Sequence, residues 1–165
     1  MSRLPKDASC PPFRPVLEGC VVRDYRMARA LGELYQSELY TIAAYLWRSL
    51  MSEKHDRDLS DLFDLFAREE IEHFRLVGEL ISALGGIPML YTQIRIDPSR
   101  YVEKTGTRFL ERLMREAIRD GKRMVDCYQT LMGQTNDRVV RSVLSHIISD
   151  EHRHIEQLRK EIDKL

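Results

Sequence analysis

Residues 59–84 read LSDLFDLFAREEIEHFRLVGELISAL, and this stretch decides the fold. Its apolar side chains recur every three or four residues, which is the spacing of one face of an α-helix. The apolar stripe consists of Leu59, Phe63, Phe66, Val77, Leu80 and Leu84. Between Phe66 and Val77 the corresponding positions hold Glu70 and His73. The stretch therefore predicts a long amphipathic helix that carries two polar groups on its buried face.

Three further segments have the same periodicity. We therefore expect four helices, at about 23–52, 57–85, 100–133 and 137–164. Proline breaks the interior of a helix, and none of the six prolines falls inside these ranges. Asp97 and Pro98 are a suitable cap and first-turn pair for the third helix.

The linkers decide how these helices are arranged. The first and last linkers are short, so each joins antiparallel neighbours. The middle linker, residues 86–99, reaches roughly 45–50 Å when extended, which matches the length of about 43 Å expected for the second helix. We therefore predict an all-α four-helix bundle with one long crossover between helices two and three. Residues 23–165 form this bundle, and residues 1–22 are a proline-containing N-terminal extension.

Other helices carry similar polar interruptions. Glu38 interrupts the stripe of the first helix, and Glu151 and His154 interrupt that of the last. The motif Glu-x-x-His occurs at 70–73 and again at 151–154, and its two side chains share one helix face. Buried charges are costly unless they are paired or bound to metal. We therefore expect a two-metal site whose ligands are Glu38, Glu70, His73, Glu151 and His154. Carboxylates mixed with imidazoles favour iron, with manganese as the alternative.

The second half of the chain lacks one carboxylate. The tyrosine seven residues after Glu38 has its counterpart in Tyr128, but the residue seven positions before Tyr128 is Gly121. The adjacent Asp120 is our expected ligand from the third helix. Glu116, or no carboxylate at all, remains the alternative.

The motifs resemble those of the ferritin-like superfamily, within it the rubrerythrin and bacterioferritin branch. The matching stretches are ELYTIAAY at 38–45, REEIEH at 68–73 and DEHRHI at 150–155. The resemblance implies that the same five residues bind metal, and that the protein is an oxidoreductase acting on peroxide or dioxygen. The alternative reactions are catalase-like disproportionation of peroxide, and oxidation and sequestration of ferrous iron. A structural metal-binding bundle without catalysis is the remaining interpretation.

The sequence departs from these families in three ways. It has no paired Cys-x-x-Cys motifs, which hold the rubredoxin-type iron of rubrerythrins, so electrons would come from a separate donor protein. Ile71 stands where bacterioferritins have the methionine that ligates haem, so no haem is expected. The chain ends at Leu165 without the fifth helix of iron-storage cages, which favours a homodimer over a 24-subunit cage.

Composition excludes several classes of protein. Lysine plus arginine total 26, as do aspartate plus glutamate, so the chain lacks the positive field typical of nucleic-acid-binding proteins. No apolar run approaches the roughly 18–20 residues of a membrane span, and no apolar signal segment follows Met1. The three cysteines form no disulfide framework. We therefore expect a cytoplasmic protein.

Overall fold

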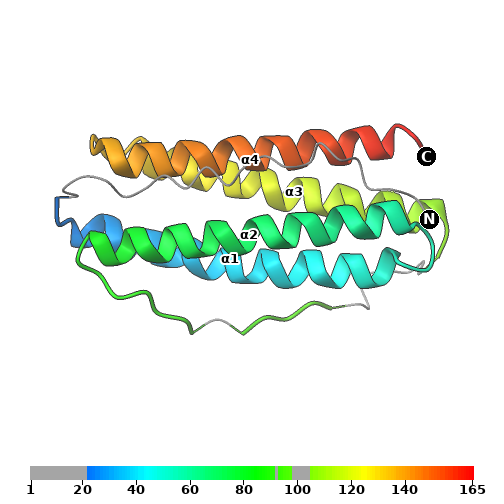
Figure 1. The fold of residues 1–165 in the computed structure, drawn as a ribbon, viewed down its shortest axis with the longest axis horizontal. Coiled ribbons are helices and arrows are strands. Elements are labelled where there is room, and N and C mark those ends of the chain that lie inside the picture. The colour runs from blue at the N-terminus through cyan, green and yellow to red at the C-terminus, as the bar shows by residue number, and fades with distance from the viewer. Residues whose placement is uncertain (1–21, 92, 98–104) are drawn as a thin grey trace.

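The computed structural model describes residues 22–91, 93–97 and 105–165. Its four helices are α1 (Tyr25–Ser52), α2 (Arg57–Ala83), α3 (Thr107–Met132) and α4 (Arg138–Ile162). Helices α1 and α4 run in one direction, and α2 and α3 run in the other (Figure 1). This confirms the predicted all-α, ferritin-like four-helix bundle in which the second and third helices are parallel.

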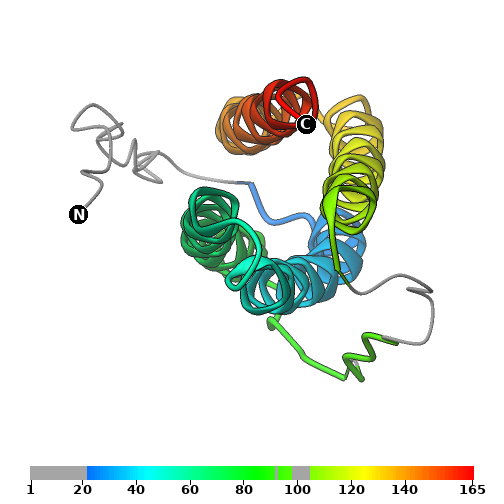
Figure 2. The same cartoon turned by 90° about the vertical axis from the view of Figure 1, so that its right-hand side faces the viewer.

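The described residues 84–91 and 93–97 of the connection from α2 to α3 run along the outside of α1 (Figure 1). The end-on view shows the four helices around a shared centre (Figure 2). Helix α1 packs against α2 and α3, and α4 packs against the same two helices. Side chains from all four helices therefore meet in the middle of the bundle.

Aspartate caps three of the four helices. The side chain of Asp24 accepts hydrogen bonds from the first-turn backbone of α1, and Asp56 and Asp137 do the same for α2 and α4. Such caps satisfy N–H groups that have no partner inside the helix, and each stabilises the fold by about 1 kcal/mol. Local sequence therefore determines where these helices begin.

Helix α3 begins later than predicted. Gly106, at φ +82°, precedes Thr107 and provides no side-chain cap. That backbone conformation favours glycine because it has no Cβ. The predicted start at Asp97 and Pro98 is therefore wrong, although Pro98 itself lies outside the described residues.

The hydrophobic core is divided into two clusters. One fills the end of the bundle where α1 and α4 begin, and includes Leu31, Leu80 and Leu144. The other fills the opposite end, and includes Phe63 and Leu113. All six residues of the predicted α2 stripe are buried. The polar interruptions in the stripes lie between these two clusters.

The remaining sequence expectations concern membranes and the N-terminus. None of the described helices is long and apolar enough to cross a membrane. The expected extension at 1–22 falls, except for Val22, outside the described residues, as do Cys10 and Cys20. Cys127 is an exposed free thiol on α3.

Candidate metal centre

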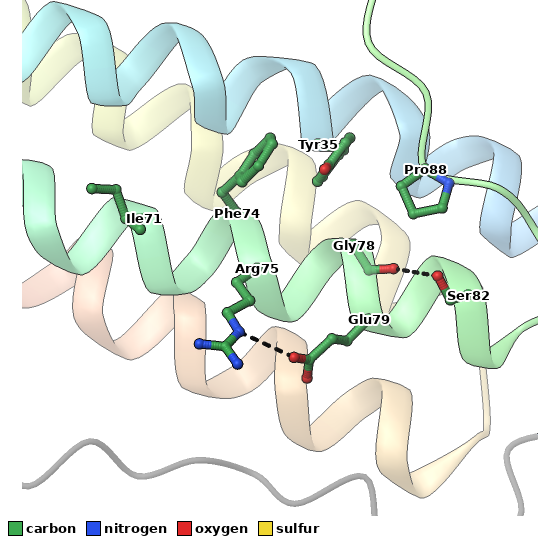
Figure 3. Close-up of a pocket in the computed structure, with 8 residues that line it drawn as sticks. All are labelled: Tyr35, Ile71, Phe74, Arg75, Gly78, Glu79, Ser82 and Pro88. Carbon is green, nitrogen blue, oxygen red and sulfur yellow. Dashed lines mark hydrogen bonds and ion pairs between the residues drawn. The ribbon is translucent and has the colours of Figure 1, made fainter.

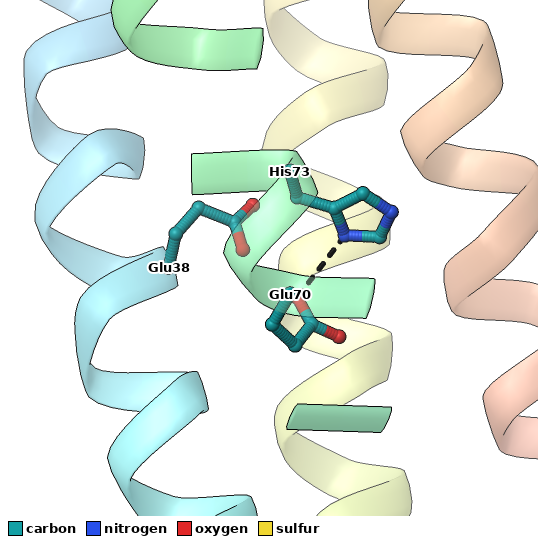
Figure 4. Close-up of side chains that lie close together, drawn as sticks. All are labelled: Glu38, Glu70 and His73. Carbon is teal, nitrogen blue, oxygen red and sulfur yellow. Dashed lines mark hydrogen bonds and ion pairs between the residues drawn. The ribbon is translucent and has the colours of Figure 1, made fainter. Parts of the chain in front are cut away.

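The middle of the bundle contains five fully buried acidic and imidazole side chains. They are Glu38 on α1, Glu70 and His73 on α2, and Glu151 and His154 on α4. Their potential ligand atoms form two groups, and within each group these atoms lie within 4.8 Å of one another. The first group is Glu38, Glu70 and His73, with Glu38 reaching from α1 toward α2 (Figure 4). The second is Glu70, Glu151 and His154, so Glu70 belongs to both.

The inner nitrogens of the two histidines face opposite oxygens of Glu70. His73 Nδ1 lies 3.1 Å from Glu70 Oε2, and His154 Nδ1 lies 3.2 Å from Glu70 Oε1. One carboxylate therefore lies between two imidazoles that come from different helices. This is the arrangement required for a carboxylate that is shared by two neighbouring cations.

The outer nitrogens of the histidines contact carboxylates across the α2–α4 boundary. His154 Nε2 lies 2.5 Å from Glu69 Oε2, and His73 Nε2 lies 3.2 Å from Asp150 Oδ2. Such contacts fix the orientation of a metal-binding imidazole and leave its other nitrogen free to ligate. Each histidine is thus held by the helix opposite its own.

Arg153 joins these two carboxylates. Its Nη1 donates to both oxygens of Glu69, at 3.1 and 3.2 Å, and its Nη2 donates to Asp150 Oδ1 at 2.8 Å. The sequence prediction missed Glu69, Asp150 and Arg153. A signal was available, because an acidic residue directly precedes the glutamate of both Glu-x-x-His motifs.

Replacing Arg153 with glutamine should weaken metal binding by up to about tenfold, because Arg153 acts one step beyond the direct partners of the ligands, whose loss costs about 10–100-fold. The reason is that both carboxylates would lose the guanidinium that orients them. Calorimetric titration with a divalent metal would measure this change. The matched control is Arg159→Gln on the exposed side of α4, which should leave affinity unchanged. Arg153→Lys should retain part of the affinity, and wild-type affinity in Arg153→Gln would contradict a positioning role.

Several potential metal-ligand atoms in the centre have no hydrogen-bond partner among the described residues. They include Glu38 Oε2 and both carboxylate oxygens of Glu151, while Glu70 Oε1 and His154 Nδ1 lie 3.2 Å apart without the geometry of a hydrogen bond. An unsatisfied buried polar atom costs about 1–3 kcal/mol, and more when it is charged. The clustering of these atoms fits cations, because carboxylate oxygens and imidazole nitrogens together suit iron or manganese.

The pKa values of these groups reflect crowding of like and unlike charges. Burial and the charge of Glu70 raise the pKa of Glu38, and they raise that of Glu151 to about 8. Burial alone would raise the pKa of Glu70, but the neighbouring charge of His73 lowers it. Burial alone would lower the pKa of His154, but Glu69 and Glu70 raise it to about 9. Protons therefore balance the charge of this centre in the absence of a cation.

Two buried tyrosines border the centre. The hydroxyl of Tyr128 on α3 donates a hydrogen bond to Glu38 Oε1. The ring of Tyr45 on α1 lies edge-on to His154, with ring centroids 6.2 Å apart. Burial raises the pKa of both phenols, so each remains a neutral hydrogen-bond donor. Tyr128 thereby orients one carboxylate of the first group.

Asp120 is not part of either group. Its carboxylate pairs with Arg48 Nη2 at 2.6 Å, and it lines a cavity of about 800 Å³ between α1, α3 and residues 95–97. The alternative ligand, Glu116, lines the same cavity and pairs with Arg112 at 3.3 Å. The structure therefore does not bring Asp120 to the centre. The buried position on this face of α3 is Gly121.

A second cavity of about 710 Å³ lies over the outer face of α2 (Figure 3). It is a shallow, open depression of the surface, bordered by Tyr35 and Pro88, with Ile71 at its far end. The Arg75–Glu79 ion pair, at 3.3 Å, lies along its edge. Ile71 offers only a hydrocarbon side chain here, so it provides no ligand for the iron of a haem.

The fold is shared with three solved structures. One is a dodecameric thioferritin, the bacterioferritin-related protein from Bacteroides fragilis, with 23% identity, 86% of this chain and 87% of that chain covered, and a TM-score of 0.70. Another is the bacterioferritin BfrA of Mycobacterium tuberculosis, with 20% identity, 87% of each chain covered and a TM-score of 0.71. The third is the bacterioferritin of Rhodobacter capsulatus, with 19% identity, 87% of each chain covered and a TM-score of 0.72. No curated protein matches the sequence.

The family assignment comes from the sequence itself. The model of the ferritin-like domain matches residues 28–165, which include all four helices except the first turn of α1. The predicted resemblance to the ferritin-like superfamily is thereby confirmed, and the chain belongs to the ferritin-like domain family.

Proposed function

We propose that this protein binds two iron ions in the middle of the bundle and oxidises ferrous iron there, as a ferroxidase that takes iron up. The observation that carries this proposal is the convergence of five buried donor side chains, several of whose atoms have no partner among the described residues. Cations would neutralise the carboxylates, including the two unpartnered oxygens of Glu151, and would take the inner nitrogen of each imidazole as a ligand.

The proposed ligand set assigns each side chain a role. Glu38 and His73 would hold one ion, Glu151 and His154 would hold the other, and Glu70 would contribute to both. Each ferrous ion loses one electron, so a pair of ions, with two protons, reduces dioxygen to hydrogen peroxide. The buried position of the side chains keeps bulk water away from the reacting ions.

The structural neighbours support the proposal by analogy. The Rhodobacter capsulatus protein is described as having a dinuclear site and haem iron, and the Bacteroides fragilis protein as dodecameric. We propose a dinuclear iron site here, with manganese as the alternative metal. We propose no haem, because Ile71 cannot ligate one. We also propose that the chain self-associates, at least as a homodimer.

A second candidate function is peroxide reduction with a separate electron donor, as in rubrerythrins. The motifs REEIEH and DEHRHI are compatible with it, because they resemble those of the joint rubrerythrin and bacterioferritin branch. Protein loaded anaerobically with Fe²⁺ would be mixed with either dioxygen or peroxide, and the appearance of Fe³⁺ would be followed optically. Rapid oxidation by dioxygen, with retained ferric iron, supports the ferroxidase. Faster oxidation by peroxide, with repeated turnover when a reductant is added, would instead support the peroxidase.

Metal binding should release protons and should tighten as pH rises. Metal ligation requires deprotonated donors, whereas at pH 7 Glu151 and His154, with pKa values of about 8 and about 9, hold protons in the metal-free protein. Apparent affinity should therefore increase from pH 7 to about pH 9. Calorimetric titration in buffers of different ionisation enthalpy would measure the proton release. Affinity that falls or stays constant over this range would contradict the assignment.

A further inference from the structure

We propose that Glu151 replaces the carboxylate that α3 lacks. On this assignment Glu151 is a terminal ligand of the second ion, and Glu70 alone is shared between the two ions. The inference rests on the proposed metal-binding function and concerns how this chain completes its site. It gives the two motif glutamates different roles, although the Glu-x-x-His motifs repeat with the same spacing.

The positions of the two motif glutamates are not equivalent. Glu70 has oxygens close enough to belong to both ligand groups, facing His73 on one side and His154 on the other. Glu151 belongs only to the group that contains Glu70 and His154. Glu70, the counterpart of Glu151 in the repeat, therefore lies between the two proposed ion positions, whereas Glu151 lies at only one of them.

The reason is found on α3 at Gly121. This residue is buried, and a Cβ added to it would lie 3.2 Å from Glu151 Oε2 and 3.3 Å from Ile155 Cγ1. Both distances are shorter than ordinary van der Waals contact. The carboxylate of Glu151 therefore lies against the α3 backbone, in space that any larger residue would occupy.

No carboxylate of α3 competes for this place. Asp120 is paired with Arg48 and Glu116 with Arg112, and both line the cavity between α1 and α3. Both oxygens of Glu151, in contrast, are buried and have no hydrogen-bond partner in the described part of the chain. Both are thus available to a cation beside Gly121, where α3 supplies no carboxylate of its own.

The assignment predicts that substitution of Glu151 and substitution of Glu38 each remove a different one of the two ions. We choose Co²⁺ as the probe, because it stays divalent in air, and calorimetric titration as the measurement. Wild-type protein should bind two Co²⁺ ions. Glu151→Gln should lose one ion and keep the other at unchanged affinity, and Glu38→Gln should do the same for the opposite ion. If Glu151 were shared between the two ions, Glu151→Gln would lower the affinity for both of them, and that result would overturn the inference.

Gly121→Ala tests the same idea through the backbone. The added methyl group should displace Glu151 and lower the affinity for one of the two ions about tenfold, leaving the affinity for the other unchanged. Gly32→Ala is the matched control, since that helical glycine in α1 has nothing within 4 Å of an added Cβ. Circular dichroism would verify that each variant folds. If Gly121→Ala bound both ions with wild-type affinity, that result would count against the role of the glycine.

The outcomes separate the inference from the proposed function. A wild-type protein that binds no Co²⁺ would contradict the metal site itself. A wild-type protein that binds two ions, both weakened in Glu151→Gln, would leave the metal site intact and remove only the terminal role of Glu151.

Discussion

Replacing Glu70 with glutamine should abolish binding of both metal ions and, with it, iron oxidation. Glu70 is the one residue that belongs to both ligand groups, and its two oxygens face the inner nitrogens of both histidines. An amide has the same shape but carries no charge and has one acceptor oxygen. Losing a partner that only orients a ligand costs 10–100-fold in affinity. Losing this ligand should therefore cost more than about 100-fold.

The matched control is Glu72→Gln, which removes one negative charge from the exposed side of the same helix. Titration with Fe²⁺ under anaerobic conditions should give two ions per chain for this control and none for Glu70→Gln. Stopped-flow oxidation should likewise be preserved only in the control. Two bound ions in a folded Glu70→Gln variant would contradict the shared position of Glu70.

Removing metal should lower the thermal stability of the protein. A cation that binds only the folded chain at 100 times its dissociation constant adds about 2.7 kcal/mol to the free energy of unfolding. For a chain of this size each kcal/mol raises the melting temperature by roughly 2–4 °C. Loading with metal should therefore raise the Tm by roughly 5–10 °C, because the cation binds the folded chain and not the unfolded one.

Differential scanning calorimetry with and without a chelator would measure this shift. The Glu70→Gln variant serves as the control, since a chelator should leave its Tm unchanged. A wild-type Tm that does not respond to chelation would favour a helical scaffold whose buried glutamates and histidines satisfy one another.

The architecture was predictable because apolar periodicity and linker length suffice to define it. The stripe from Leu59 to Leu84 determined the buried face of α2, and the reach of the middle linker determined that α2 and α3 are parallel. The start of α3 was not predictable in this way. Its first turn follows Gly106, a glycine at positive φ, rather than a residue with a capping side chain. A single glycine does not indicate the start of a helix as an Asp, Asn, Ser or Thr cap does.

The site was predictable where a charge interrupts a stripe and less so elsewhere. Glu38, Glu70 and Glu151 stand at core positions of otherwise apolar faces, and the structure buries all three. Asp120 follows the same spacing only approximately. A shift of one residue on a helix turns a side chain by about 100°. Asp120 therefore pairs with Arg48 at the edge of α3, and the residue that faces the centre is Gly121.

The partners of the histidines could not be read from helical spacing. Glu69 and Asp150 each act on the opposite helix, so their role depends on how α2 and α4 pack. Arg153 is partly exposed and looks like a solvated surface residue in the sequence. Only the three-dimensional arrangement shows that it joins both carboxylates.

The most direct test of the metal site is a crystal structure of protein loaded with Fe²⁺ under anaerobic conditions, with anomalous scattering measured at the iron absorption edge. We predict two anomalous peaks in the middle of the bundle. One should lie against Glu38, Glu70 and His73, and the other against Glu70, Glu151 and His154. A map with no peak there, or with peaks only on the surface, would contradict the conclusion that these buried side chains bind metal.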